Sequence, residues 1–425
     1  MNLILASGME VFTTILYVIL AIMVLLLMVL IHEFGHYVVG RLLNFKITEF
    51  SIGFGKAIFQ RKNKRGELIS LRIFPLGGYC AFAGENDEDD GKDKDKSSAE
   101  NNKIEDNNDQ KIEENKIESI KEEKTKDEKE KVIELDKNNE PKKGTELLFN
   151  EQKPWKRLLV YGAGVFFNFL SAILFSFILL VSFGYDIPQV KAVDNTKIEY
   201  VGSEVLQEGD VIWKVNGEKI SFAFSGTISQ LISKPFNQNT EITDNDVVLS
   251  VNRDGQMIDV TIKVKKVTET VDDSEVTKLQ TGFETKAYVH SFWDALGRCF
   301  ELAFGFGWVV LKGFWQIITG QVGFSELGGP ISTIGMITTI TQSGWANFFI
   351  LLPLLAANLA IFNFLPIPAL DGCHALFTLL EWIFRKPVVS RKVEGYIHFY
   401  GLLALLLLVV IADIVHISVV GFPKL

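Results

Sequence analysis

The chain has 425 residues, enough for two or three domains, and combines 48% hydrophobic with 22% charged residues. Its formal net charge of −9 reflects one segment rich in lysine and acidic residues, 85–153, and no basic stripe indicates nucleic-acid binding. The three cysteines, Cys80, Cys299 and Cys373, are far apart and lack C-x-x-C spacing, so they predict neither a disulfide framework nor a cysteine zinc site.

The first predicted element is an apolar helix that carries a metal-binding motif. Residues 11–30 hold no charge, which predicts a membrane span over about residues 11–38; the uncharged flank before it and the missing cleavage site argue against a signal peptide. At its end stand His32, Glu33 and His36 in the pattern H-E-F-G-H. In a helix this spacing places two imidazoles on one face, where they can bind zinc, and leaves the glutamate free to act on a water. The alternative is two interfacial histidines beside a snorkelling glutamate.

A charged segment follows. Residues 85–145 consist of Lys, Glu, Asp and Asn with scattered Ile and no aromatic residue. Such a segment buries too little apolar surface to offset its ordering entropy, so it is predicted to be a disordered or loosely helical cytoplasmic insertion. A solvated loop is favoured over a regulatory docking site.

Three further apolar segments predict spans at about residues 158–183, 345–364 and 400–415. A fifth segment, residues 292–318, is interrupted by charges and favours a helix that lies in the interface or packs on the spans.

Basic residues at the span ends predict the orientation. With four spans they all fall on one side, which the positive-inside rule assigns to the cytoplasm, so both termini and residues 186–289 are expected outside the cell inner (plasma) membrane. These basic residues are Arg41, Lys46, Lys153, Lys156, Arg157, Arg385, Lys386, Arg391 and Lys392.

Residues 189–267 predict a small β-rich domain. Residues 247–251 and 260–264 read as paired strands across the turn Arg253-Asp254-Gly255. The run L-x-x-G-D-x-I-x-x-V-N-G at residues 206–217 resembles a PDZ domain, in which an extended peptide adds to a sheet edge. A steric guard that binds no peptide is an equal alternative.

A third metal ligand is expected near the end of the third span, in the sequence N-F-L-P-I-P-A-L-D-G at residues 363–372. An aspartate there is costly unless it is paired or metal-bound, and two prolines break the helix just before Asp371. His32, His36 and Asp371 are predicted at matching depth, so we expect them to hold Zn²⁺ and leave the fourth position for water. Glu33 is expected to act as general base and then as general acid.

Together these motifs make the chain resemble the site-2 protease family of intramembrane zinc metalloproteases, of the bacterial type with a single inserted PDZ domain. H-E-F-G-H and N-x-x-P-x-P-x-L-D-G match its two signature motifs. Shorter matches are S-I-G-F-G (51–55), F-P-L-G-G-Y (74–79), G-G-P-I (328–331) and the start of the second span (155–168). The chain departs from the family at Val165, where Pro is usual after Gly164, and at Cys373, where a second Gly is common.

The resemblance implies an α-helical polytopic membrane protein with about four transmembrane helices, an inserted β-rich PDZ-like domain and a membrane-associated β segment. The expected divisions are 1–84 (first span and β segment), 85–150 (charged insertion), 151–188 (second span), 189–267 (PDZ-like extracytoplasmic domain), 268–343 (interfacial helical region) and 344–425 (third and fourth spans).

The resemblance also implies a zinc-dependent endopeptidase, embedded in the lipid bilayer, that cleaves single-span membrane protein substrates within the membrane. Such regulated intramembrane proteolysis acts on anti-sigma factors or signal-peptide remnants and follows an upstream site-1-type protease. Asn363 and Asn168 are expected to hold the substrate or to donate to the oxyanion, unless they serve as interhelical hydrogen-bonding groups. Gly77, Gly78 and Tyr79 belong to a segment expected to pair with an unwound substrate, or merely to shape the mouth of the site.

Three rival functions compete with this one. A membrane-anchored zinc protease of exposed loops needs the identical site, so only cleavage mapping separates it. A catalytically silent PDZ-type scaffold has no chemical need for Glu33. A cation transporter fits the H-E-x-x-H spacing less well than a closed tetrahedral site does.

Overall fold

The computed structural model describes residues 2–85, 147–238, 241–271 and 274–421. The charged insertion predicted over residues 85–150 therefore lies almost entirely outside the described residues.

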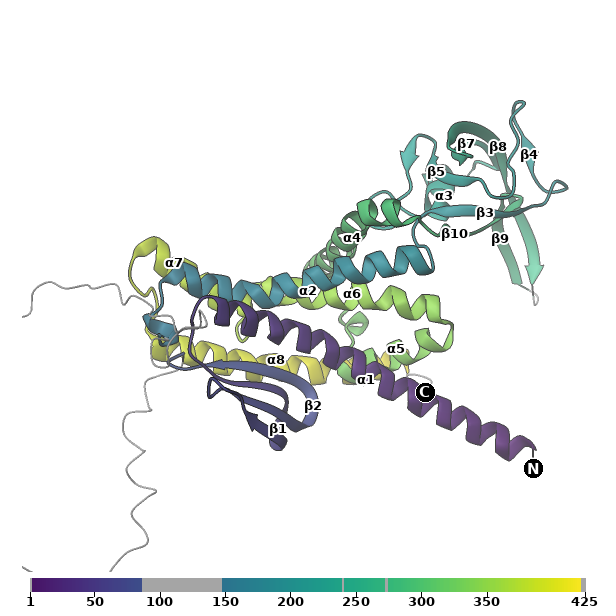
Figure 1. Ribbon diagram of the computed structural model, residues 1–425. Helices are drawn as coiled ribbons and strands as arrows, with labels where there is room; N and C mark the ends of the chain where they lie inside the picture. Colours follow the sequence, from purple (N-terminus) through teal and green to yellow (C-terminus); the bar gives the residue numbers. More distant parts are fainter. Residues whose placement is uncertain (1, 86–146, 239–240, 272–273, 422–425) are drawn as a thin grey trace, which may run out of the picture.

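Four helices of the described chain are long and apolar enough to cross a membrane. They are α1 (Asn2–Leu42), α2 (Pro154–Ser182), α6 (Trp345–Phe364) and α8 (Arg391–Val420), and Figure 1 shows them running in one general direction. Pro154 opens α2 in the first turn, where no backbone N–H is needed for the helix. The number and positions of the spans agree with the sequence prediction, and the chain is a polytopic membrane protein with a β-rich region.

Small side chains let these helices pack closely around α2. Ala21 of α1, Ala172 of α2 and Ala356 of α6 are completely buried in one shared core, as expected where helix backbones approach each other in a membrane.

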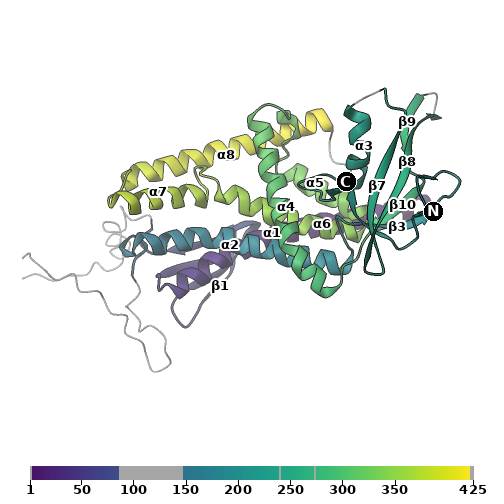
Figure 2. The same cartoon turned by 90° about the horizontal axis from the view of Figure 1, so that it is seen from above.

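Helix α4 (Phe292–Ile318) coincides with the fifth apolar segment of the sequence and is not one of the four candidate spans. Figure 2 shows it crossing the other helices steeply. Ala303 and Phe306 are buried in the shared core. Two of the charges that interrupt the segment form ion pairs with residues after α2, since Arg298 pairs with Asp186 and Glu301 with Lys219.

A curled β-hairpin follows α1 and consists of β1 (Ile47–Lys62) and β2 (Leu68–Phe82). Both strands bend at glycines, among them Gly53 and Gly55 with φ of +86° and +85°. Because of the bends, residues 49–52 pair with 68–71 on one side and with 78–81 on the other. In this register the segment 78–82 lies at an edge of the curled sheet, beside α1.

The β-rich domain between α2 and α4 contains one eight-stranded sheet with the strand order β10-β3-β5-β7-β8-β4; β6 pairs with β5 and β9 with β8. Its helix is α3 (Ile228–Gln238). The strands are β3 (Pro188–Val193), β4 (Glu199–Tyr200), β5 (Val211–Val215), β6 (Glu218–Lys219), β7 (Asp244–Arg253), β8 (Gln256–Val271), β9 (Ser274–Gln280) and β10 (Phe283–Ala287).

The β7–β8 hairpin forms as its alternating sequence predicts. Val247 pairs with Ile262 and Leu249 with Val260, and all four side chains are completely buried. Asp254 and Gly255 both have positive φ, which a two-residue hairpin turn requires.

Short helices complete the chain: η1 (Phe149–Glu151), η2 (Phe324–Glu326), α5 (Pro330–Gln342) and α7 (Asp371–Phe384). Helix α5 has Gly329 at its N-cap, which offers no side-chain acceptor. Asp413 of α8 replaces that cap, because its carboxylate accepts hydrogen bonds from the backbone N–H groups of Gly329, Ile331 and Ser332. One buried side chain thus ties α8 to α5.

Candidate metal centre

His32, His36 and Asp371 come together although the second and the third lie 335 positions apart in the sequence. The Nε2 atoms of His32 and His36 lie 2.9 Å and 3.1 Å from Asp371 Oδ2, and 3.2 Å from each other. Both histidines are buried, at 6% and 7% exposure.

This triangle of atoms fits a tetrahedral zinc ion. Zn–N bonds of about 2.0–2.1 Å place neighbouring ligand atoms about 3.3 Å apart, close to the three separations here. Two imidazoles and one carboxylate are a zinc donor set that leaves a fourth position open. Asp371 Oδ2 is buried and has no conventional hydrogen-bond partner within the described chain, as expected of an atom meant for a cation.

The groups behind the histidines set the tautomers that metal binding requires. His36 Nδ1 lies 2.8 Å from the Val160 carbonyl oxygen, so Nδ1 carries the proton and Nε2 is free to bind a metal. His32 Nδ1 lies 3.1 Å from the side-chain amide of Asn168, which is completely buried. When His32 binds metal through Nε2, its Nδ1 is protonated, so the amide must present its oxygen. That orientation also provides a partner for Asn168 Oδ1, which otherwise has no hydrogen-bond partner among the described residues.

Two glycines allow α1 and α2 to approach at the site. A Cβ on Gly164 would come within 2.7 Å of His32 Nδ1 and would also overlap His36. A Cβ on Gly35 would lie 2.6 Å from the Ala163 carbonyl oxygen. The H-E-x-x-H spacing predicts the candidate ligands on α1 but not this close approach, which depends on how the two helices pack.

Glu33 lies between the metal ligands and the hairpin. The backbone N–H of Cys80 donates to its carboxylate, and a Cβ on Gly78 would come 3.3 Å from Glu33 Cγ. A narrow hollow here is lined by Leu26, Leu30, Glu33, Ser51, Ile52, Gly77 and Gly78. Gly77 and Gly78 therefore lie beside the Glu33 side chain.

Tyr79 has a partner of its own, because its hydroxyl donates to Glu49, which also pairs with Arg72. Asn363 is buried in the last turn of α6, eight residues before Asp371.

The turn between α6 and α7 presents Asp371. Asp371 is the first residue of α7, and Gly372 allows this first turn to pack on the end of α6, since a Cβ there would overlap the carbonyl oxygens of Phe364 and Leu365.

An ion-pair network that the sequence does not predict connects α7 to two other helices: Glu381 of α7 pairs with Arg157 of α2 and with Arg391 of α8. Arg157 was counted as a flanking charge but is almost fully buried, at 1% exposure. Its ion pair with Glu381 connects α2 to α7.

Comparisons with known proteins identify the family of the chain. A model of peptidase family M50 matches residues 20–408. The zinc metalloprotease RasP of Oceanobacillus iheyensis is 28% identical over 419 residues, which cover 90% of this chain and 94% of the relative. A relative from Campylobacter jejuni is 28% identical over 93% of this chain and 92% of the relative. One from Clostridium perfringens is 26% identical over 94% of this chain and 98% of the relative.

The family match spans both halves of the metal site, and the predicted family, enzyme class and zinc cofactor are confirmed. The chain belongs to peptidase family M50, the site-2 protease family, and is a zinc-dependent metalloendopeptidase of the membrane.

Proposed function

We propose that this protein cleaves transmembrane segments of single-span membrane proteins inside the bilayer. The observation that carries the proposal is the position of the chemistry: His32, Glu33 and His36 lie on a membrane span and are flanked by a hairpin with an apolar outer surface. An exposed-loop protease would need its glutamate open to water rather than to such a surface.

The apolar surface of the hairpin supports contact with lipid. Seven large apolar side chains of the hairpin are between 39% and 67% exposed, which favours a surrounding of lipid over water. They are Phe54, Ile58, Phe59, Ile69, Leu71, Ile73 and Phe74. The hairpin is therefore proposed to be the membrane-associated β segment.

A substrate helix must open before it can be cut, because its backbone hydrogen bonds are satisfied internally. The edge at residues 78–82 offers backbone groups to an extended substrate strand beside Glu33. Gly77 and Gly78 let a substrate backbone approach closely, and the Tyr79–Glu49–Arg72 cluster holds the edge in place.

The residues have separate roles in this proposal. His32, His36 and Asp371 hold zinc, which when bound lowers the pKa of its water and polarises the scissile carbonyl. Glu33 accepts the water proton and donates it to the leaving amide nitrogen. Asn363 is proposed to donate to the oxyanion. Asn168 is proposed to orient His32 in addition to, or in place of, contacting the substrate.

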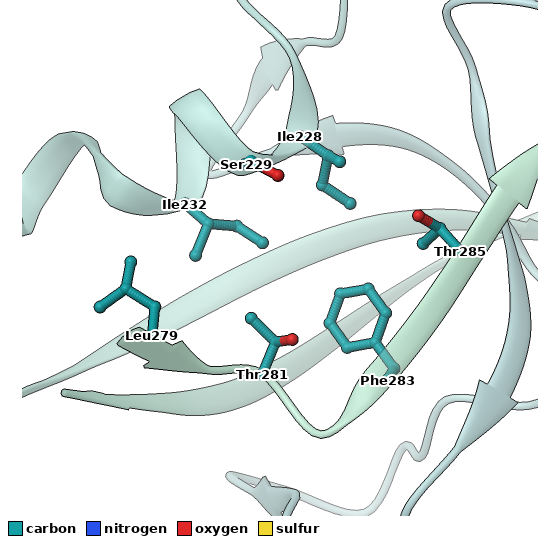
Figure 3. A pocket seen from close by; sticks show the side chains of 7 residues that line it. All are labelled: Ile228, Ser229, Ile232, Leu279, Thr281, Phe283 and Thr285. Carbon is teal, nitrogen blue, oxygen red and sulfur yellow. The ribbon is translucent and has the colours of Figure 1, made fainter. Parts of the chain in front are cut away.

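The β-rich domain is proposed to be PDZ-like. Helix α3 and the edge strand β10 flank a pocket of about 200 Å³, and Figure 3 shows apolar and hydroxyl side chains converging on it. Its lining is Ile228, Ser229, Ile232, Leu279, Thr281, Phe283 and Thr285. An extended peptide added to β10 would place alternate side chains there. In the alternative, the domain is a steric filter that admits only trimmed substrates and binds no peptide.

The orientation follows from charge. The β-rich domain lies away from the C-terminal end of α1 and the N-terminal ends of α2 and α8 (Figure 1). Arg41, Lys156 and Arg391 belong to those helix ends, so the positive-inside rule favours a position of the domain outside an inner (plasma) membrane. Substrates such as anti-sigma factors or signal-peptide remnants would then be trimmed outside by an upstream site-1-type protease.

The test is a cleavage assay in membranes on a tagged single-span substrate, comparing wild type with Glu33→Gln at equal expression and equal bound zinc. Glu33→Gln removes the general base and leaves the ligands, so we expect cleavage within the span by wild type and none by the variant. Cleavage that maps only to exposed loops would favour the loop protease and overturn the proposal.

A further inference from the structure

The backbone turn just before Asp371 is in a conformation that its sequence disfavours. Ala369 has a φ of +76°, in the left-handed region that residues with a Cβ rarely adopt. Leu370 then returns to extended geometry, and α7 begins at Asp371. The direction of the metal-binding carboxylate therefore depends on a turn that must be held from outside.

His398 of α8 contacts this turn directly. The backbone N–H of Ala369 donates to His398 Nδ1 at 3.0 Å. Three residues later on α8, Gly401 lies against Pro368 so closely that a Cβ on the glycine would overlap the proline ring. Helix α8 thus meets the turn at two adjacent positions.

The ring of His398 also supports the helix that follows the turn. It stacks on His374 with a centroid separation of 3.5 Å and an interplanar angle of 4°. His374 in turn stacks on Tyr161 of α2 at 5.1 Å and 13°. His374 lies one helical turn after Asp371, so the segments before and after the ligand both rest on His398.

A second metal site is the competing interpretation of these side chains. Ligand atoms of His374, Glu394 and His398 lie within 4.8 Å of one another. His398 Nδ1 is occupied by a backbone donor, however, so in the neutral ring Nε2 carries the proton and offers no lone pair. Two parallel stacked rings also direct their lone pairs along parallel planes rather than toward one point. The geometry favours orientation of the turn over metal binding.

We infer that His398 is a positioning residue, which holds the left-handed Ala369 turn and thereby directs Asp371 Oδ2 toward His32 and His36. The inference rests on the zinc site and the proteolytic function proposed above. His398 contacts neither the ligand atoms nor a substrate and acts through the backbone.

Zinc affinity tests this role independently of cleavage. The dissociation constant of zinc would be measured by chelator competition on the full-length protein in detergent for His398→Phe and His398→Asn. Phe keeps a ring to stack on His374 but removes the acceptor, whereas Asn keeps an acceptor near the Nδ1 position but removes the ring. We expect His398→Phe to weaken zinc binding about 10- to 100-fold, as for other groups that orient metal ligands, and His398→Asn to stay close to wild type.

A second substitution separates positioning from a loss of packing. Glycine adopts positive φ without a steric penalty, so Ala369→Gly in the His398→Phe background is expected to restore most of the zinc affinity. The thermal unfolding of the zinc-free variants provides a further reference, because all are expected to unfold near the wild-type temperature.

Three results would overturn the inference. If His398→Phe binds zinc with wild-type affinity, the hydrogen bond from Ala369 N–H to His398 Nδ1 is not needed to position Asp371. Losses as large in His398→Asn as in His398→Phe, without rescue by Ala369→Gly, would mean that the imidazole is needed for something other than the hydrogen bond to the Ala369 turn. A second zinc equivalent in wild type that both variants lose would establish the competing metal site. If wild type and Asp371→Asn bind zinc equally, the zinc site itself is wrong, an outcome distinct from these three.

Discussion

Gly164 is the residue on which the shape of the metal centre depends most directly. Gly164→Ala would place a methyl group against the imidazoles of both proposed zinc ligands on α1, within 2.7 Å of His32 Nδ1. We expect zinc affinity and cleavage to fall by about 100-fold or more, because the rings must rotate away from the ligand geometry. Zinc content after dialysis and the cleavage rate measure this.

Gly162→Ala is the matched control for that substitution. Gly162 lies on the same helix, but a Cβ there would meet no atom within 4 Å. Zinc binding and cleavage should therefore equal those of wild type. Equal effects of the two substitutions would mean that α2 responds to any added methyl group and that the contact with the histidines is unimportant.

At the residue scale, the sequence predicts ligands better than it predicts the groups that orient them. His32 and His36 follow from helical spacing, and Asp371 follows from the cost of a carboxylate beside a span. The groups behind them do not follow from the sequence, since Asn168 of α2 contacts His32 and His398 of α8 contacts the Ala369 turn before Asp371. An asparagine within an apolar segment signals a buried polar partner but does not identify it.

At the element scale, the cap that α8 provides for α5 is a structural requirement. Asp413→Ala would leave three backbone N–H groups of α5 without their acceptor in a buried position. We expect a loss of about 2–3 kcal/mol in the free energy of unfolding. Asp413→Asn keeps one acceptor oxygen and should lose less. Thermal unfolding in detergent measures both, and Val410→Ala, at a position 54% exposed on the same helix, should change little.

The pocket between α3 and β10 distinguishes a peptide-binding domain from a filter. Ser229→Glu would put a charge beside the apolar side chains that line it, at an exposed position of α3. If the domain binds peptide, this variant should lose cleavage of trimmed substrates at least about tenfold, because burying an unpaired carboxylate is costly. If the domain is a filter, cleavage of trimmed substrates is unchanged, and replacing residues 188–287 by a short linker admits untrimmed ones. Quantified cleavage of paired trimmed and untrimmed substrates gives the answer.

The elements themselves were largely predictable, and their details were not. Uncharged runs fix the spans, and α6 coincides with the predicted residues 345–364. The hairpin after α1 was expected as one β segment, but its strands bend so that residues 49–52 have partners on both sides. Glycine positions indicate flexibility in such a segment without specifying the register.

At the scale of the whole molecule, the joint between the β-rich domain and the helices contains a buried histidine. His290 is 3% exposed, its backbone N–H donates to Leu180 of α2, and neither ring nitrogen has a hydrogen-bond partner in the described chain. Burial, assisted by the charge of Arg298, lowers the pKa of His290 from 6.5 to about 4. The unfolded form therefore binds the proton first as the pH falls.

The sign of this shift predicts acid sensitivity of the joint. The contribution of neutral His290 is fully present above about pH 6.5 and is lost as the pH falls toward 4. His290→Phe keeps an aromatic contact with Tyr288 and cannot be protonated. Thermal unfolding at pH 7.5, 6 and 5 should show a smaller decline for the variant than for wild type. Asp186, whose pKa is raised by burial, is present in both proteins and cancels in the difference; identical declines would contradict the prediction.

The close approach of α1 and α2 also determines which positions of the H-E-F-G-H motif tolerate other residues. Phe34 is 47% exposed, so side chains of many sizes fit at that position. Gly35 faces the Ala163 carbonyl oxygen, where any added carbon collides with backbone. The two middle positions of H-E-x-x-H are therefore unequal in this protein, whose effective motif is H-E-x-G-H.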